Sequence, residues 1–149
     1  MGTWDTGPFD NDVAADFAGG LDDAAEHERP AAIRAALEDA VGAGEDEGLM
    51  GHVADRAIAA AAIVAAQCPG GAPTDPICGP EEAVPPLPED LRELAVRALD
   101  RAVGPDSDLP ELWGDGDSAE KWREGVARIR AVLAEALRDP RQLELPIDS

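Results

Sequence analysis

The chain has 149 residues, a length typical of one domain that is large enough to bury a hydrophobic core. It carries 32 acidic and 12 basic residues, a formal net charge of −20, which argues against direct binding to nucleic acid or to an anionic membrane. The first residues lack the apolar segment of a signal peptide, and the protein is expected to be cytoplasmic.

The chain is expected to begin with a short arm followed by a first helix. Asp10 or Asn11 is expected to cap that helix, because a short polar side chain accepts a hydrogen bond from the free N–H groups of a first turn. Asp12 follows in the first turn, where negative charge is favourable. Trp4 and Phe9 are the large apolar side chains of the arm, and both are expected to be anchored in the domain.

Two adjacent glycines, Gly19 and Gly20, are expected to end or loosen the first helix. A second helix is expected from Pro30, a favourable first helical residue, to Gly42. Its apolar side chains recur at helical spacing and are expected to face the core: Ile33, Ala36, Leu37, Ala40 and Val41.

The third helix, expected over residues 48–67, is predicted to be the centre of the domain. Residues 57–66 are apolar without interruption, so a helix made from them has no polar face to expose to water. The stretch is too short to cross a bilayer, which needs roughly 20 apolar residues. Its alanines favour the helix and let neighbouring helices approach closely.

The second half of the chain is expected to hold a loop and two further helices. Residues 68–88 are rich in proline and are expected to form an irregular loop, in which Cys68 and Cys78 could bridge if oxidised. The fourth helix is expected to run from residue 88 to Gly104, with these side chains inward: Leu91, Leu94, Ala95, Ala98, Leu99 and Ala102. The last helix is expected to be capped by Asp117 or Ser118 and ended by Pro140, with this apolar stripe: Trp122, Val126, Ile129, Leu133 and Leu137.

These elements predict an all-α protein, a single compact helical domain of about five helices around a buried, alanine-rich central helix. The domain is expected to cover residues 1–140, with the proline-rich loop inside it. Residues 141–149 are expected to form a flexible C-terminal tail.

The N-terminal arm carries a motif that resembles the signature of the family named domain of unknown function 4259. Its residues are Trp4, Gly7, Pro8, Phe9, Asp10, Asn11 and Asp12. The resemblance resumes at residues 94–103 and 105–107, at 111–113 with Trp113, and at 122–133 with Trp122. It implies a small helical bacterial protein and brings no activity with it. Asp5 stands where the family usually has glycine, and Ala62 where an acidic residue is frequent.

One polar group along the central helix is a candidate catalytic site. His52, Asp55 and Arg56 are spaced to share one helix face, and His52 could serve as an acid or a base. The simpler interpretation is that the three side chains hydrogen-bond one another at the start of the helix. Asp10, Asp12 and Asp16 lack the spacing of a calcium loop, so no metal and no cofactor are predicted.

The acidic residues before residue 48 favour the main hypothesis, a non-catalytic protein-binding module, to which the enzyme is an alternative. This part of the chain holds only two basic residues, Arg29 and Arg34. A field of this kind favours a basic protein partner, as in immunity or inhibitor proteins. The partner-binding residues are predicted to include Asp22, Asp23, Glu26 and Glu28.

The tail suggests a different partner, the bacterial DNA sliding clamp. Its sequence resembles the short peptides that dock on this clamp, with Gln142, Leu143, Leu145 and Ile147 as the contacting side chains. An extended peptide of this form presents alternate side chains to a groove. The protein would then be an accessory factor recruited to the clamp.

Overall fold

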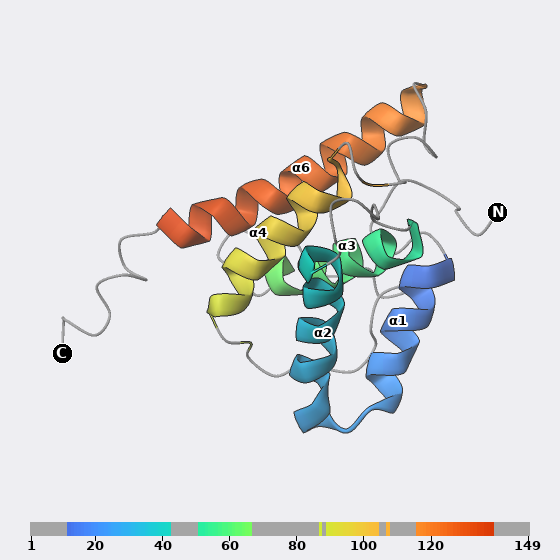
Figure 1. Cartoon of the computed structure of the whole chain (residues 1–149), viewed down its shortest axis with the longest axis vertical. Coiled ribbons are helices and arrows are strands. Elements are labelled where there is room, and N and C mark those ends of the chain that lie inside the picture. Colours follow the sequence, from blue (N-terminus) through green and yellow to red (C-terminus); the bar gives the residue numbers. More distant parts are fainter. Residues whose placement is uncertain are drawn as a thin grey trace.

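The computed structural model describes residues 12–42, 51–66, 87, 89–104, 107 and 116–138 (Figure 1). These residues form five α-helices and one short 3-10 helix, and no strand occurs among them. The elements are α1 (Asp12–Asp23), η1 (Glu26–Glu28), α2 (Arg29–Gly42), α3 (Gly51–Ala66), α4 (Asp90–Ala102) and α6 (Asp117–Arg138). The predicted all-α fold is confirmed.

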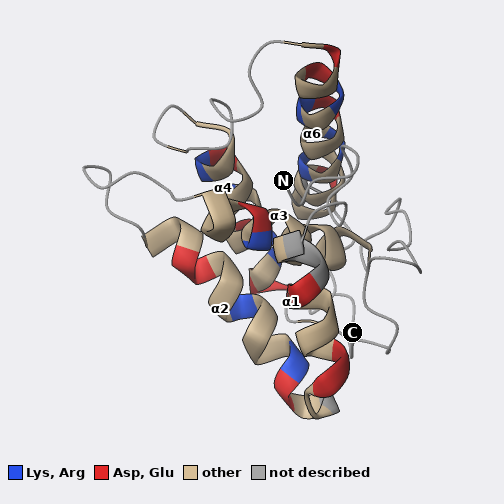
Figure 2. Ribbon diagram, turned by 90° about the vertical axis from the view of Figure 1, so that its right-hand side faces the viewer, with Lys and Arg blue, Asp and Glu red and all other residues tan. Residues whose placement is uncertain are grey.

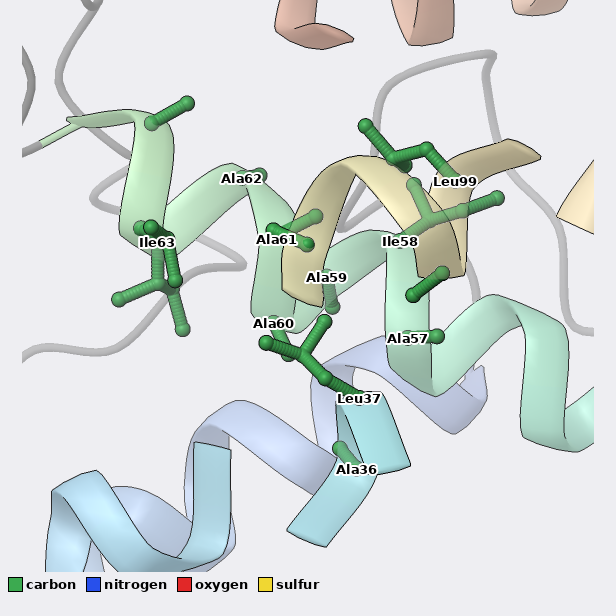
Figure 3. Close-up of a cluster of buried hydrophobic side chains, with 14 of the residues drawn as sticks. Ala36, Leu37, Ala57, Ile58, Ala59, Ala60, Ala61, Ala62, Ile63 and Leu99 are labelled. Atoms are coloured by element: carbon green, nitrogen blue, oxygen red, sulfur yellow. The ribbon is translucent and has the colours of Figure 1, made fainter. Parts of the chain in front are cut away.

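Helix α3 is the centre of the structure, as its sequence predicts. It packs against α1, α2, α4 and α6. Every residue from Ala57 to Ala65 is buried, so this part of the helix meets protein on all sides. Figure 3 shows Ala36 and Leu37 of α2 on one side of α3 and Leu99 of α4 beside Ile58. Alanine is the residue that permits this crowding, because its side chain lets several helix backbones come close.

Helix α4 lies between α2 and α6 and contacts both of them as well as α3. Two exposed ion pairs join these helices: Arg34 of α2 to Asp90 at 3.0 Å, and Arg130 of α6 to Asp100 at 2.7 Å. The hydrogen bond from Arg34 lowers the pKa of the Asp90 carboxyl. Exposed pairs of this kind contribute at most about 1 kcal/mol each, so apolar packing holds α4 in place.

Helix α1 does not end at its two glycines, although an end there is one of the two outcomes expected from the sequence. It continues through Gly19 and Gly20 to Asp23. Leu21, which follows the glycines, is only 1% exposed. Burial of this leucine and of Ala18 against the domain stabilises the helical conformation more than the two glycines weaken it.

Helix ends also differ from the prediction. The second helix begins at Arg29, one residue before Pro30, and the fourth begins at Asp90 with Glu89 in the cap position. The N–H of Glu120 donates to the carbonyl of Gly116 at 3.2 Å. Gly116, rather than Asp117 or Ser118, therefore occupies the cap position before α6.

The apolar stripe of α6 is correct except at its last member. Trp122, Val126 and Leu133 are buried, whereas Leu137 is 38% exposed. Ala136 is buried in its place. The inward positions follow a +4, +3, +4, +3 pattern, which matches about 3.6 residues per turn better than two successive steps of four.

No α-helix in the described ranges is both long and apolar enough to cross a membrane. Several predictions fall outside these ranges: the arm with Trp4, Gly7, Pro8, Phe9, Asp10 and Asn11, the Cys68 and Cys78 loop, Trp113, and the tail after residue 138.

Candidate functional site

The end of α1, the short helix η1 and the start of α2 form one acidic corner of the molecule. The acidic corner is defined by Asp22, Asp23, Glu26 and Glu28. Asp23 and Glu28 are exposed and Asp22 is half-buried. Figure 2 shows acidic residues concentrated where α1 ends and the chain turns into α2, whereas both signs of charge alternate along α6.

A buried arginine lies beneath the acidic corner. Arg29 is 8% exposed, and its Nε donates a hydrogen bond to the carbonyl oxygen of Leu21 at 2.8 Å. Its Nη2 donates to the carbonyl of Ala24 at 3.1 Å and reaches that of Asp22 at 3.5 Å. The last carbonyls of a helix have no partner within the helix, so Arg29 supplies donors that the end of α1 requires.

Both arginines of residues 12–42 therefore have partners within the chain: Arg29 is buried, and Arg34 forms an exposed ion pair. Arg29 binds backbone carbonyls of α1, and Arg34 pairs with Asp90 of α4. Residues 12–42 hold eight acidic residues against these two arginines. Eight acidic residues against two arginines give this part of the chain a net charge of −6, with His27 taken as neutral.

One exposed face of α1 continues the acidic corner. Asp16, Gly19, Gly20 and Asp23 follow one another at spacings of three, one and three residues, which places them on the same side of a helix. All four are exposed. A Cβ added at either glycine would have no atom within 4 Å. Packing therefore does not require glycine at either position. The two glycines leave the backbone of α1 exposed between two carboxylates.

The group predicted on the central helix lies in the first half of α3. His52 is exposed, while Asp55 and Arg56 are half-buried. Burial raises the pKa of Asp55 to about 6, and the neighbouring charge of His52 opposes this rise. A carboxyl group with this pKa exchanges a proton near neutral pH, which is the property required of an acid or base catalyst.

The three aspartates considered for a metal ion lie only partly within the described residues. No group of three or more His, Cys, Asp and Glu suited to a metal occurs in the part of the chain that the structure describes. Asp16 is exposed on α1, and Asp12 opens the same helix. Asp10 lies outside the described residues.

Sequence reasoning missed Arg29. The residue stands between an acidic segment and Pro30, a position that reads as an ordinary surface residue. The available signal was the end of α1, which has no basic residue in its last turn. A helix end without such a residue requires donors from elsewhere, and the nearest arginine provides them. The predicted tail residues Gln142, Leu143, Leu145 and Ile147 lie outside the described residues.

The sequence profile of the family described as Domain of unknown function (DUF4259) matches residues 2–125, and the chain belongs to this family. The match includes the acidic corner and the polar group of α3, and it ends within α6. The resemblance inferred from the N-terminal motif is confirmed. Comparison with curated proteins and with solved structures gave no match.

Proposed function

We propose that this protein is a non-catalytic binding module whose acidic corner associates with a basic surface of another protein, as an inhibitor or immunity protein does. The observation that carries the proposal is the engagement of Arg29 and Arg34 within the protein. Their positive charge is held by carbonyl oxygens and by Asp90, while Asp23 and Glu28 remain exposed. Unbalanced surface charge of this kind steers a partner of opposite charge and speeds association.

The composition of α1 supports the proposal independently. Asp22 and Asp23 stand at the C-terminal end of the helix, where a negative charge is unfavourable by about 0.3 to 1 kcal/mol. Gly19 and Gly20 weaken a helix interior by roughly 0.5 to 1 kcal/mol each relative to alanine. A surface that departs from helix preferences in two ways on one face is typical of a functional site.

A pull-down with matched variants tests the proposal. The corner variant replaces Asp22 and Asp23 with Asn and Glu26 and Glu28 with Gln. The matched control removes four charges from exposed positions of α6 through these changes: Asp117→Asn, Glu120→Gln, Glu124→Gln and Glu135→Gln. Each protein is immobilised and exposed to a lysate of the source cells in about 0.1 M and about 1 M salt, where the Debye length is about 10 and about 3 Å.

A basic protein is expected to be retained at low salt by the wild type and by the α6 variant, and not by the corner variant. Retention is expected to fall at high salt because screening shortens the range of the attraction. A protein retained equally by all three, or equally at both salt concentrations, would contradict the proposal.

The raised pKa of Asp55 favours a second candidate, an enzyme in which Asp55, His52 and Arg56 transfer a proton. The Asp55→Asn substitution separates the two candidates. Under the binding proposal this variant retains the same partner as the wild type. If the variant loses a turnover that the corner variant keeps, the enzymatic candidate is supported instead.

A further inference from the structure

We propose that Arg29 is a positioning residue of the acidic corner. The inference rests on the proposed binding function and names the residue that fixes the shape of the binding surface. Without such a residue the carboxylates of η1 would move relative to those of α1.

The contacts of α1 show why such a residue is needed. Helix α1 packs on α3, whereas η1 runs directly into α2. The acidic corner therefore joins two parts of the molecule that are held by different neighbours. Arg29 belongs to α2 and bonds Leu21 and Ala24 at the end of α1, so it spans the turn that carries the acidic residues.

The chemistry of the side chain suits this task. A guanidinium presents several N–H donors in one plane, and Arg29 directs Nε to one carbonyl and Nη2 to another. Hydrogen bonds from a charged donor are stronger than neutral ones, particularly when they are shielded from water.

Backbone hydrogen bonds also hold the turn between α1 and α2. The N–H of Ala24 is shared between the carbonyls of Gly20 and Leu21, at 3.0 and 3.2 Å. The N–H of Glu28 donates to the carbonyl of Ala25 at 2.8 Å. These two bonds close the turn on either side of Glu26, and the exchange rates of their amide hydrogens report whether the turn stays closed.

The test uses Arg29→Lys, which keeps the charge and removes the planar set of donors. Arg34→Lys makes the same change at the ion pair with Asp90 and serves as the matched control. Ile33→Val, at a fully buried position of α2, controls for a general loss of stability. In Arg29→Lys the amides of Ala24 and Glu28 are expected to exchange about tenfold faster, because a charge-assisted bond has been lost. In both controls these two rates should stay within about twofold of the wild type.

Binding is measured with a decalysine peptide as the basic probe. Arg29→Lys is expected to weaken binding by about threefold, because the loosened turn must be ordered when the peptide binds. The two controls should bind as the wild type does. Faster exchange with unchanged affinity would show that Arg29 is structural only and would overturn the inference.

Two further readouts keep the outcomes distinct. The Nε–H of Arg29 in the wild type is expected to exchange with water more slowly than that of exposed Arg123, and equal rates would overturn the inference without any variant. The corner variant tests the proposed function in the same assay. If it binds decalysine as the wild type does, the proposed function fails. If it loses binding and Arg29→Lys does not, only the role of Arg29 fails.

Discussion

Replacing Gly19 and Gly20 with alanine is expected to stabilise the protein. Both glycines lie inside α1, both are exposed, and a Cβ at either position would have no atom within 4 Å. The substitution therefore adds no clash and removes conformational freedom from the unfolded chain. Each change is worth about 0.5 to 1 kcal/mol, so the double variant should gain about 1 to 2 kcal/mol.

The gain is measured by urea unfolding and by thermal unfolding. For a chain of this length, 1 kcal/mol corresponds to about 2 to 4 °C, so Tm should rise by about 2 to 8 °C. Gly104→Ala is the contrasting variant, because a Cβ there would lie 3.0 Å from the carbonyl oxygen of Asp100. That variant should be less stable than the wild type. A double variant with unchanged or lower stability would refute the claim that these glycines answer no packing requirement.

Three other substitutions test the packing and the electrostatics. The pKa of Asp55 is raised from 3.8 to about 6, so the stability that this carboxyl group contributes is full below pH 3.8 and is lost as the pH rises through 6. Asp55→Asn should therefore be more stabilising at pH 8 than at pH 4, by about 1 to 2 kcal/mol after allowance for partial exposure. An equal effect of the substitution at both pH values would contradict this prediction. Leu99→Ala should lower the free energy of unfolding by about 2 to 5 kcal/mol, as measured in urea, because the side chain is fully buried against α3. Ala60→Leu should lower the free energy of unfolding by about 1 to 3 kcal/mol in the same assay. Ala127→Leu, on the exposed face of α6, should change the free energy of unfolding by less than about 0.5 kcal/mol. A tolerated leucine at residue 60 would show that α3 is less crowded than described.

The fold could be predicted from sequence where a pattern depends on many residues. Residues 57–66 form an apolar run that only a surrounded helix can accommodate, and their burial follows directly. The inward positions of α2 and α4 follow in the same way from their 3.6-residue period. Such patterns survive an error at a single residue.

The failures concern single residues whose environment is set by packing. Local propensity predicts that Gly19 and Gly20 end or loosen the helix, but the helix continues to Asp23, because the burial of the next residue, Leu21, outweighs that propensity. Leu137 fits an apolar spacing, but the inward position belongs to Ala136. The sequence gives no measure of which of two adjacent apolar residues meets a neighbouring helix.

The same distinction applies to the candidate site: its composition could be predicted from the sequence, whereas its contacts could not. The acidic composition of the corner is visible in sequence, because Asp22, Asp23, Glu26 and Glu28 lie within seven residues of one another. The contacts of Arg29 could not be predicted, because they depend on how α2 returns beside the end of α1. The raised pKa of Asp55 likewise depends on burial by other helices.

Carboxyl footprinting of the complex tests the central claim most directly. The partner retained in the pull-down is mixed with the wild-type protein, exposed carboxylates are coupled to glycine ethyl ester by carbodiimide, and the extent of labelling at each residue is read by mass spectrometry. Asp16, Asp23 and Glu28 are expected to be labelled in the free protein and protected in the complex, while Glu120 and Glu124 of α6 stay labelled in both. Protection at the α6 carboxylates, with Asp16, Asp23 and Glu28 still labelled, would contradict the account.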